Sequence, residues 1–364
     1  MQKRVKIALS VLLVALLAVM AWQALRPRGP VYQGKLLSSW LNEAFWSGGP
    51  SAQTTSATRS VGTNAVPTLL GMVKARDGGF KRTLVMLSRR PSRVLFRLHS
   101  AEDYHRMAMW GFEALGPTAK PAVPALIRLL KHDDVEVRST AAYCLGVIGP
   151  SADEAVAALT ECLSDAVNSG ESSRATAVLK ERAATALGMM GPSARGAIPI
   201  LTVATNDQMW YARNAAKAAV MRISGESVVP LIEQLRDTSD PIKWYEAAML
   251  ISDFGTNAEP AIPLLISALG TKNDIILGHA AIALGKIHRQ PDVCVPALIP
   301  LLSSPSVSTR QKSLGALGGF GDAATSAVPA MILCLSDSDP WVRMRATSVL
   351  KAINLEAATK AGVK

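Results

Sequence analysis

The chain has five histidines and four cysteines, the residue types most often used to bind metal ions. Metal ligands on one helix face must lie three or four residues apart. His279 and His288 are nine residues apart, and no two cysteines have the Cys-X-X-Cys spacing of zinc and redox motifs. We therefore expect no metal site, and cysteines that act as small core residues. The full set is His99, His105, His132, His279, His288, Cys144, Cys162, Cys294 and Cys334.

Sequence motifs of other chemistries are also missing. The chain has no Gly-X-Ser-X-Gly elbow for a nucleophile, no phosphate-binding P-loop and no Gly-X-Gly-X-X-Gly after a strand. The sequence therefore predicts no catalytic residues and no cofactor.

A group of aromatic residues has types that favour protein recognition. All five fall where a predicted turn leads into a helix. They form either a candidate protein-binding aromatic edge or a set of plugs that fill gaps between neighbouring turns. Solvent exposure of at least three of them as one patch would favour binding, and burial would exclude it. The residues are Trp210, Tyr211, Trp244, Tyr245 and Trp341.

These residues are positioned by a unit that repeats at a nearly constant interval. Four prolines, from Pro230 to Pro329, recur every thirty-three positions, each after Val or Ile. Self-similarity at this period is typical of solenoids, in which each unit buries its apolar face on its neighbours. The sequence predicts an all-α solenoid, a right-handed superhelix of about eight helical hairpins. The aligned positions are Pro67, Pro124, Ala157, Pro199, Pro230, Pro263, Pro296 and Pro329.

One unit shows the logic of the hairpin. Apolar residues at i, i+3, i+4 and i+7 over 123–130 predict a first helix, with Pro124 tolerated in its first turn. A short turn leads to a second helix over 137–148, which Gly149 ends. Alanine and glycine in the second helices predict close approach of successive units.

An arginine recurs fourteen positions after the proline, where the turn leads into the second helix. We interpret it as a structural ladder to neighbouring carboxylates or carbonyls, with a ligand clamp as the alternative. Trp244 and Leu277 occupy the matching places in two units. The arginines are Arg138, Arg213, Arg310 and Arg343.

Two spacings exceed the period. The interval from Pro67 to Pro124 is too long by twenty-four positions, which places an insertion within about 75–103. The interval from Ala157 to Pro199 is too long by nine positions, which predicts a loop at 168–173. Insertions in solenoids lie in loops and often mark the binding side.

The amino-terminal segment 7–25 contains no charged residue and is preceded by Lys3, Arg4 and Lys6. As a helix it would span roughly 28 Å, close to the thickness of a bilayer core. We expect an uncleaved signal anchor over 1–28. Cleavage near Ala21 is the alternative. The flanking charges favour repeats on the extracytoplasmic side, periplasmic in a bacterium.

We divide the remainder as a linker over 29–60, a solenoid over 61–356 and a tail over 357–364. Within the linker, the apolar face of 35–46 predicts an amphipathic helix that caps the exposed end of the stack. An interfacial membrane helix is the alternative. Residues 47–59 are expected to form an irregular connection.

The net charge of +11 is confined to the amino-terminal third. Residues 107–364 hold 23 basic and 24 acidic residues, a net of −1. A nucleic-acid groove needs a basic face along the repeats, so we expect no nucleic-acid partner. The basic region 81–97 would contact anionic lipid, or else form a solvated charged face.

The segments Ala-Val-Pro-Ala-Leu-Ile-Arg-Leu-Leu (122–130), Asp-Val-Glu-Val-Arg (134–138) and Ala-Ala-Tyr-Cys-Leu-Gly-Val-Ile-Gly (141–149) resemble HEAT repeats. The short form is similar to that of phycobilisome lyases, and the layout resembles membrane-anchored bacterial HEAT-repeat proteins. The resemblance covers roughly 61–356. It implies a non-enzymatic, membrane-tethered scaffold with an unidentified protein partner. The alternative that it implies is a cytosol-facing HEAT-type lyase or protein-modification enzyme.

Overall fold

The computed structural model describes residues 29–46, 49–79, 83, 85, 98–171 and 173–363. Within these residues all regular secondary structure is helical except for a small antiparallel β-hairpin of β1 (Val31–Tyr32) and β2 (Lys35–Leu36). The segments 1–28 and 86–97, with most of 80–85, lie outside the described residues, and so do the predicted membrane segment 7–25 and the basic side chains of 81–97. None of the described helices is both long and apolar enough to span a bilayer.

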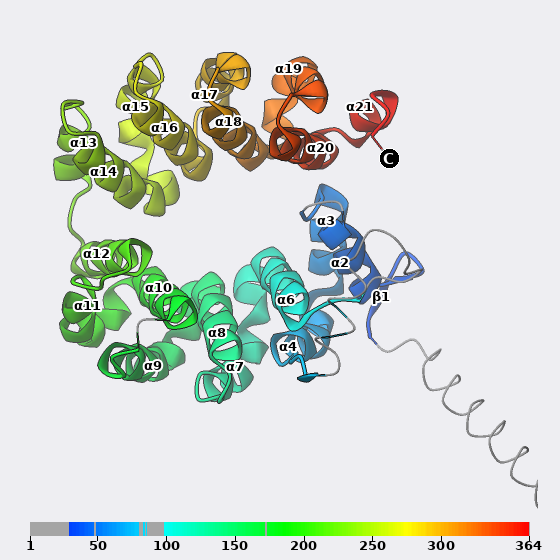
Figure 1. Cartoon of the computed structure of the whole chain (residues 1–364). Coiled ribbons are helices and arrows are strands. Elements are labelled where there is room, and N and C mark those ends of the chain that lie inside the picture. Colours follow the sequence, from blue (N-terminus) through cyan, green and yellow to red (C-terminus); the bar gives the residue numbers. More distant parts are fainter. Residues whose placement is uncertain are drawn as a thin grey trace, which may run out of the picture.

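The predicted solenoid of helical hairpins is confirmed, and eight hairpins lie within the described residues (Figure 1). The first helix of each hairpin begins at or next to the aligned proline position in seven of the eight units. In the seventh unit Pro296 lies inside the helix, and Pro291 begins it. These outer helices are α4 (Val66–Val73), α7 (Val123–Leu129), α9 (Val156–Asn168), α11 (Ile198–Ala204), α13 (Val229–Gln234), α15 (Ile262–Ala268), α17 (Pro291–Leu298) and α19 (Val328–Leu333).

The second helices line the inside of the curved array (Figure 1). Aspartate, asparagine or serine N-caps begin most of them, as at Asp134, Asp240 and Asp339. These inner helices are α6 (Ala101–Leu115), α8 (Val135–Ile148), α10 (Arg174–Met190), α12 (Trp210–Ser224), α14 (Pro241–Asp253), α16 (Asp274–Ile287), α18 (Val307–Gly319) and α20 (Pro340–Ile353).

The connection from an inner helix to the next outer helix is commonly a short 3₁₀ helix. It begins at a glycine with positive φ, such as Gly149 (φ 67°) or Gly191 (φ 64°), a conformation that other residues adopt only at a cost. The loop predicted at 168–173 is found between α9 and α10. The longer connection between α4 and α6, residues 74–100, contains most of the insertion predicted at 75–103, whose last three residues begin α6.

The amino-terminal linker is more structured than expected. Residues 47–59 were expected to be irregular, but α3 (Ala52–Val61) begins there, with Ser51 Oγ accepting from the Thr54 N–H at 3.2 Å. The helix expected over 35–46 is α2 (Leu37–Trp46), because Lys35 and Leu36 belong to β2. Leu37 and Leu41 of α2 are fully buried against the array, so protein covers this apolar face rather than lipid.

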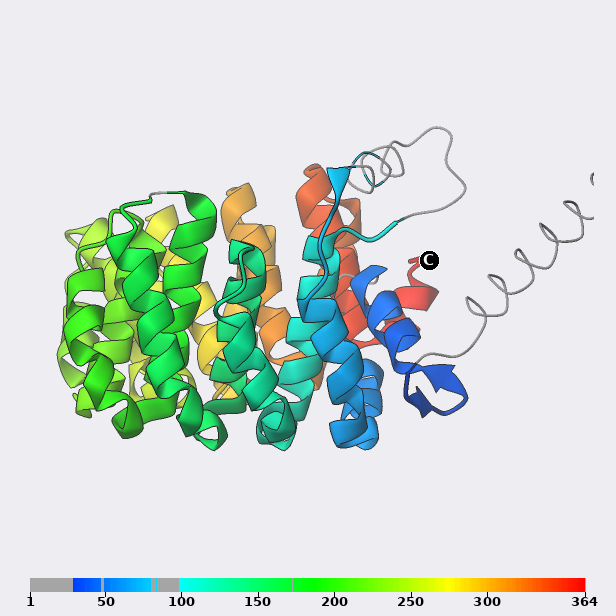
Figure 2. The same cartoon turned by 90° about the horizontal axis from the view of Figure 1, so that it is seen from below.

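The carboxyl-terminal tail, expected over 357–364, is also helical at its start. Helix α21 (Leu355–Lys360) is capped by Asn354 and buries Ala358. The array curves until α20 and α21 lie beside α2 and α3 (Figures 1 and 2). A cavity of about 280 Å³ separates the two ends, lined by Trp40 and Gln53 on one side and by Lys351 and Leu355 on the other.

The hydrophobic core consists of two clusters that meet at α12. Ala216 and Ile223 of this helix belong to the amino-terminal cluster, whereas Ala218 belongs to the carboxyl-terminal one. Each cluster runs along the interface between outer and inner helices, as a solenoid requires.

Successive inner helices approach so closely that glycine is needed at their crossings. A Cβ added at Gly285 would lie 2.5 Å from the Cα of Ala316 on α18. The same addition at Gly146 or Gly188 would come within 3.0 Å of a backbone Cα on the next inner helix. At Gly285 the backbone must shift before a side chain fits, whereas at Gly146 and Gly188 the neighbouring helix must move by a few tenths of an ångström.

We expect Gly285→Ala to destabilise the protein by about 1–3 kcal/mol, because the added methyl overpacks the α16–α18 crossing. The matched control is Gly71→Ala on α4, where nothing lies within 4 Å of the added Cβ. There the gain in helix propensity predicts stabilisation by about 0.5–1 kcal/mol. Urea unfolding followed by circular dichroism measures both changes, and equal effects at the two positions would contradict the close crossing.

Candidate functional site on the inner helices

The recurring arginines satisfy backbone carbonyls of the turn between the two helices of their own hairpin. This confirms their interpretation as a structural ladder. In each case Nη1 donates to the carbonyl six residues earlier, a group that the helix ends leave without a partner. The bonds are Arg138 to His132 (2.7 Å), Arg213 to Asp207 (3.0 Å), Arg310 to Ser304 (2.9 Å) and Arg343 to Asp337 (2.7 Å).

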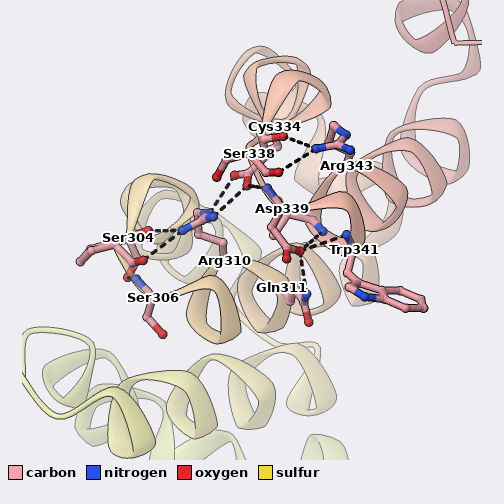
Figure 3. A network of polar contacts seen from close by, with 12 residues as sticks. Ser304, Ser306, Arg310, Gln311, Cys334, Ser338, Asp339, Trp341 and Arg343 are labelled. Atoms are coloured by element: carbon pink, nitrogen blue, oxygen red, sulfur yellow. Dashed lines mark hydrogen bonds and ion pairs between the residues drawn. The ribbon is translucent and has the colours of Figure 1, made fainter.

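Arg310 also joins its unit to the next one (Figure 3). Its Nε and Nη2 each donate to a carboxylate oxygen of Asp337 at 2.8 Å, and both side chains are about one-tenth exposed. The guanidinium holds the pKa of Asp337 below its usual range. The Asp337 carbonyl accepts from Arg343, so one residue links two rungs of the ladder.

Lys180 makes the same link between two other units, and sequence analysis missed it. Its Nζ lies 2.9 Å from Oδ2 of Asp207, and both side chains are about one-tenth exposed. The unit aligned on Ala157 is longer than the others by nine positions, so its ladder position moves toward the carboxyl terminus by the same amount and falls on Lys180. If the loop at 168–173 is allowed for in the repeat spacing, the sequence predicts Lys180 as the ladder residue of this unit.

Trp244, a member of the expected aromatic edge, is a ladder residue instead. Its side chain is fully buried, and its indole N–H donates to the Leu235 carbonyl at 3.0 Å. In this unit an indole N–H therefore supplies the hydrogen bond to a backbone carbonyl that an arginine guanidinium supplies in the four units described above. Trp244 must therefore be removed from the candidate binding edge.

The remaining four aromatic residues divide into a group of three and a separate one. The Trp210 ring lies 5.7 Å from Tyr211 and 5.8 Å from Tyr245, measured between centroids. Trp210 is 44% exposed but the two tyrosines are partly buried, so the structure does not have the expected patch of at least three exposed rings. Trp341 is 62% exposed and lies on α20, three inner helices beyond α14, which carries Tyr245. We call Trp210, Tyr211 and Tyr245 the aromatic group.

His279 extends the aromatic group along the inner helices. Its ring centroid lies 4.4 Å from that of Tyr245 in an edge arrangement. Its Nδ1 is 2.7 Å from the Ile275 carbonyl and therefore donates, which leaves Nε2 as the acceptor in the neutral ring. Burial lowers the pKa of His279 and favours this neutral form. The sequence offered no signal for His279 beyond its place on a second helix.

Trp210 and Tyr211 line a groove of about 540 Å³ on the inner helices, next to the α12–α14 crossing. Asn214 also lines it, is 3% exposed, and has no partner for either its amide oxygen or its amide nitrogen. Glu181 and Arg222 contribute opposite charges. Burial raises the pKa of the Glu181 carboxyl and lowers that of Arg222.

The four cysteines are buried and separate from one another. Burial raises the pKa of Cys162 to about 11, so this thiol is protonated at neutral pH. Across the described residues, no three His, Cys, Asp or Glu side chains are grouped closely enough to hold a metal ion.

Comparison with known proteins adds the repeat type. The family model for HEAT repeats matches residues 94–180 and 295–361. No curated protein matches the chain. A crystal structure of an engineered protein is 22% identical and covers 64% of this chain and 96% of its own, with a TM-score of 0.33. A designed armadillo repeat protein in complex with the peptide (KR)4 is 18% identical and covers 64% and 99%, with a TM-score of 0.34.

We expect Arg310→Met to destabilise the protein by about 1–3 kcal/mol, because it leaves Asp337 and two turn carbonyls without their donor. Arg236→Met, which removes an exposed pair between the turn after α13 and Glu233 of that helix, should change stability little. Since the pKa of Asp337 is lowered in the folded state, its contribution is present above the unfolded value of about 3.9 and is lost as pH falls through the folded value. The stability difference between wild type and Asp337→Asn should therefore vanish in acid; a difference that grew there would contradict the ion pair.

Proposed function

We propose that this chain, whose residues 94–180 and 295–361 are HEAT repeats, is a non-enzymatic scaffold that holds a protein partner on its inner helices. The observation that carries the proposal is the aromatic group beside a groove that contains the unpartnered Asn214.

Exposed Trp and Tyr rings favour protein binding because they bury a large apolar area with little loss of side-chain freedom. The comparison with Trp244 supports this for Trp210. At the ladder rung an aromatic ring is fully buried and fills the space between helices, whereas Trp210 keeps 44% of its surface exposed. Packing between the turns therefore accounts for only part of the Trp210 side chain.

Asn214 supports the same groove independently. A buried amide without hydrogen bonds costs about 1–3 kcal/mol, and such groups are rare unless water or a ligand satisfies them. The side chain offers a donor and an acceptor side by side. A backbone amide of a bound protein segment has the complementary pair.

We expect Trp210→Ala combined with Tyr245→Ala to abolish recovery of the protein partner, because the variant removes two of the three rings of the aromatic group and changes no ladder residue. The matched control is Leu333→Ala, which removes a 75% exposed apolar side chain from the outer helix α19. The measurement is quantitative co-purification from detergent-solubilised membranes with each variant. Equal recovery with both variants would move the binding surface away from the aromatic group.

We further propose that residues 7–25 tether the scaffold to a membrane with the repeats on the extracytoplasmic side, periplasmic in a bacterium. The length of the uncharged run and the preceding Lys3, Arg4 and Lys6 support this. A reporter that is active only in the cytosol, fused after Lys364, should be silent. The same fusion without residues 1–28 is the control and should be active. Activity of the full-length fusion would reverse the orientation.

A further inference from the structure

A second cavity, of about 610 Å³, lies on the inner helices α16, α18 and α20 and has a cationic lining. We call it the basic pocket. Lys286, Lys312 and Arg345 line it together with the exposed Trp341, and none of its twelve lining residues is acidic. A cavity with one sign of charge raises the local concentration of ligands with the opposite sign.

Two of these cations lack a carboxylate partner. Lys286 is paired with Asp253 at 3.0 Å, but neither Lys312 nor Arg345 is in an ion pair with any described residue. The Nζ of Lys312 lies 3.5 Å from Nε2 of His279, which is the acceptor nitrogen of that ring. Partial burial lowers the pKa of Lys312, and the charge of Asp274 on α16 offsets this only in part.

Two partly buried cations that bridge units elsewhere in the array have carboxylate partners: Lys180 is paired with Asp207, and Arg310 with Asp337. Two others, Arg182 and Arg222, lie over aromatic rings of a neighbouring unit instead. Lys312 has no carboxylate within ion-pair distance among the described residues, which leaves room for an acid from outside the chain.

Glycines shape the floor of the basic pocket. A Cβ added at Gly315 would lie 2.6 Å from Nη2 of Arg345, and one added at Gly278 would lie 2.8 Å from Cδ of Lys312. Each basic side chain therefore lies across the preceding inner helix at a place where that helix has no side chain. This fixes the direction of the cationic groups along the inner surface.

We propose that the basic pocket binds carboxylate side chains of an acidic segment of the protein partner, with Trp341 packing against an apolar residue of that segment. The proposal rests on the proposed scaffold function and gives its partner a chemical class. A protein segment fits better than nucleic acid, because residues 107–364 have a net charge of −1 and the cations do not extend along the repeats. Contacts from Tyr245 through His279 to Lys312 connect the aromatic group with the basic pocket.

The test uses the full chain in detergent and a fluorescein-labelled, glutamate-rich peptide that carries one leucine. Fluorescence anisotropy should show saturable binding that weakens as salt screens the charges. We expect Lys312→Gln and Arg345→Gln each to raise the Kd about ten-fold, as the loss of one charge-assisted hydrogen bond predicts. The matched control is Lys272→Gln, an exposed lysine in the turn before α16, which should leave the Kd unchanged. Thermal unfolding of each variant confirms that the fold is kept.

Three outcomes would overturn the proposal: equal binding of the peptide with glutamine in place of glutamate, unchanged affinity in the Lys312 and Arg345 variants, or displacement of the peptide at equal charge by inorganic phosphate or phosphatidylglycerol vesicles. The last would assign the pocket to a free anion or a lipid headgroup. If the Lys312 and Arg345 variants still recover the natural partner while the aromatic-group variant does not, the basic pocket fails and the scaffold function stands.

Discussion

The structure depends on the close crossing of successive inner helices. A single hairpin of this chain has too little apolar surface to be stable alone, so each unit is stabilised by its neighbours. Gly146, Gly188 and Gly285 allow these crossings, and the next inner helix presents an alanine at each of them. Small residues at the crossings confine large side chains to the interface with the outer helices and to the inner surface.

A second constraint is the turn between the helices of a hairpin, whose carbonyl groups would otherwise lack donors. The arginine ladder supplies those donors at one position of the repeat, and Trp244 supplies one with its indole N–H. Because the ladder fixes the turn, residues shortly after it have defined directions along the inner surface. Asn214, Tyr245, His279 and Lys312 follow the ladder position by one or two residues in consecutive units, and they connect the groove to the basic pocket.

The repeat period predicted the number of hairpins and the position of most helices, since proline is tolerated in the first turn and glycine ends the second helix. The repeat period failed to predict features that depend on tertiary contacts. Helix α3 has low hydrophobicity and reads as a linker, but packing buries Ala57 and Thr58. The sequence grouped Trp244 with Trp210 because both lie near the start of an inner helix. Trp244 occupies the ladder position and is buried, whereas Trp210 comes three residues before it in its own unit and is exposed. The basic pocket could not be predicted from the sequence, because the repeat region is neutral as a whole. A net charge summed along the chain does not show which basic residues the curvature brings together.

The two ends of the array, α20–α21 and α2–α3, lie beside each other (Figure 1), with a cavity of about 280 Å³ between them. Repeat arrays ordinarily gain or lose a unit with little penalty, because each unit contacts only its neighbours. In this chain, deletion or duplication of a single hairpin would displace one terminus from the other by about 10 Å, the usual spacing of packed helices. The repeat number therefore decides whether the two ends lie beside each other, a dependence that linear arrays do not have.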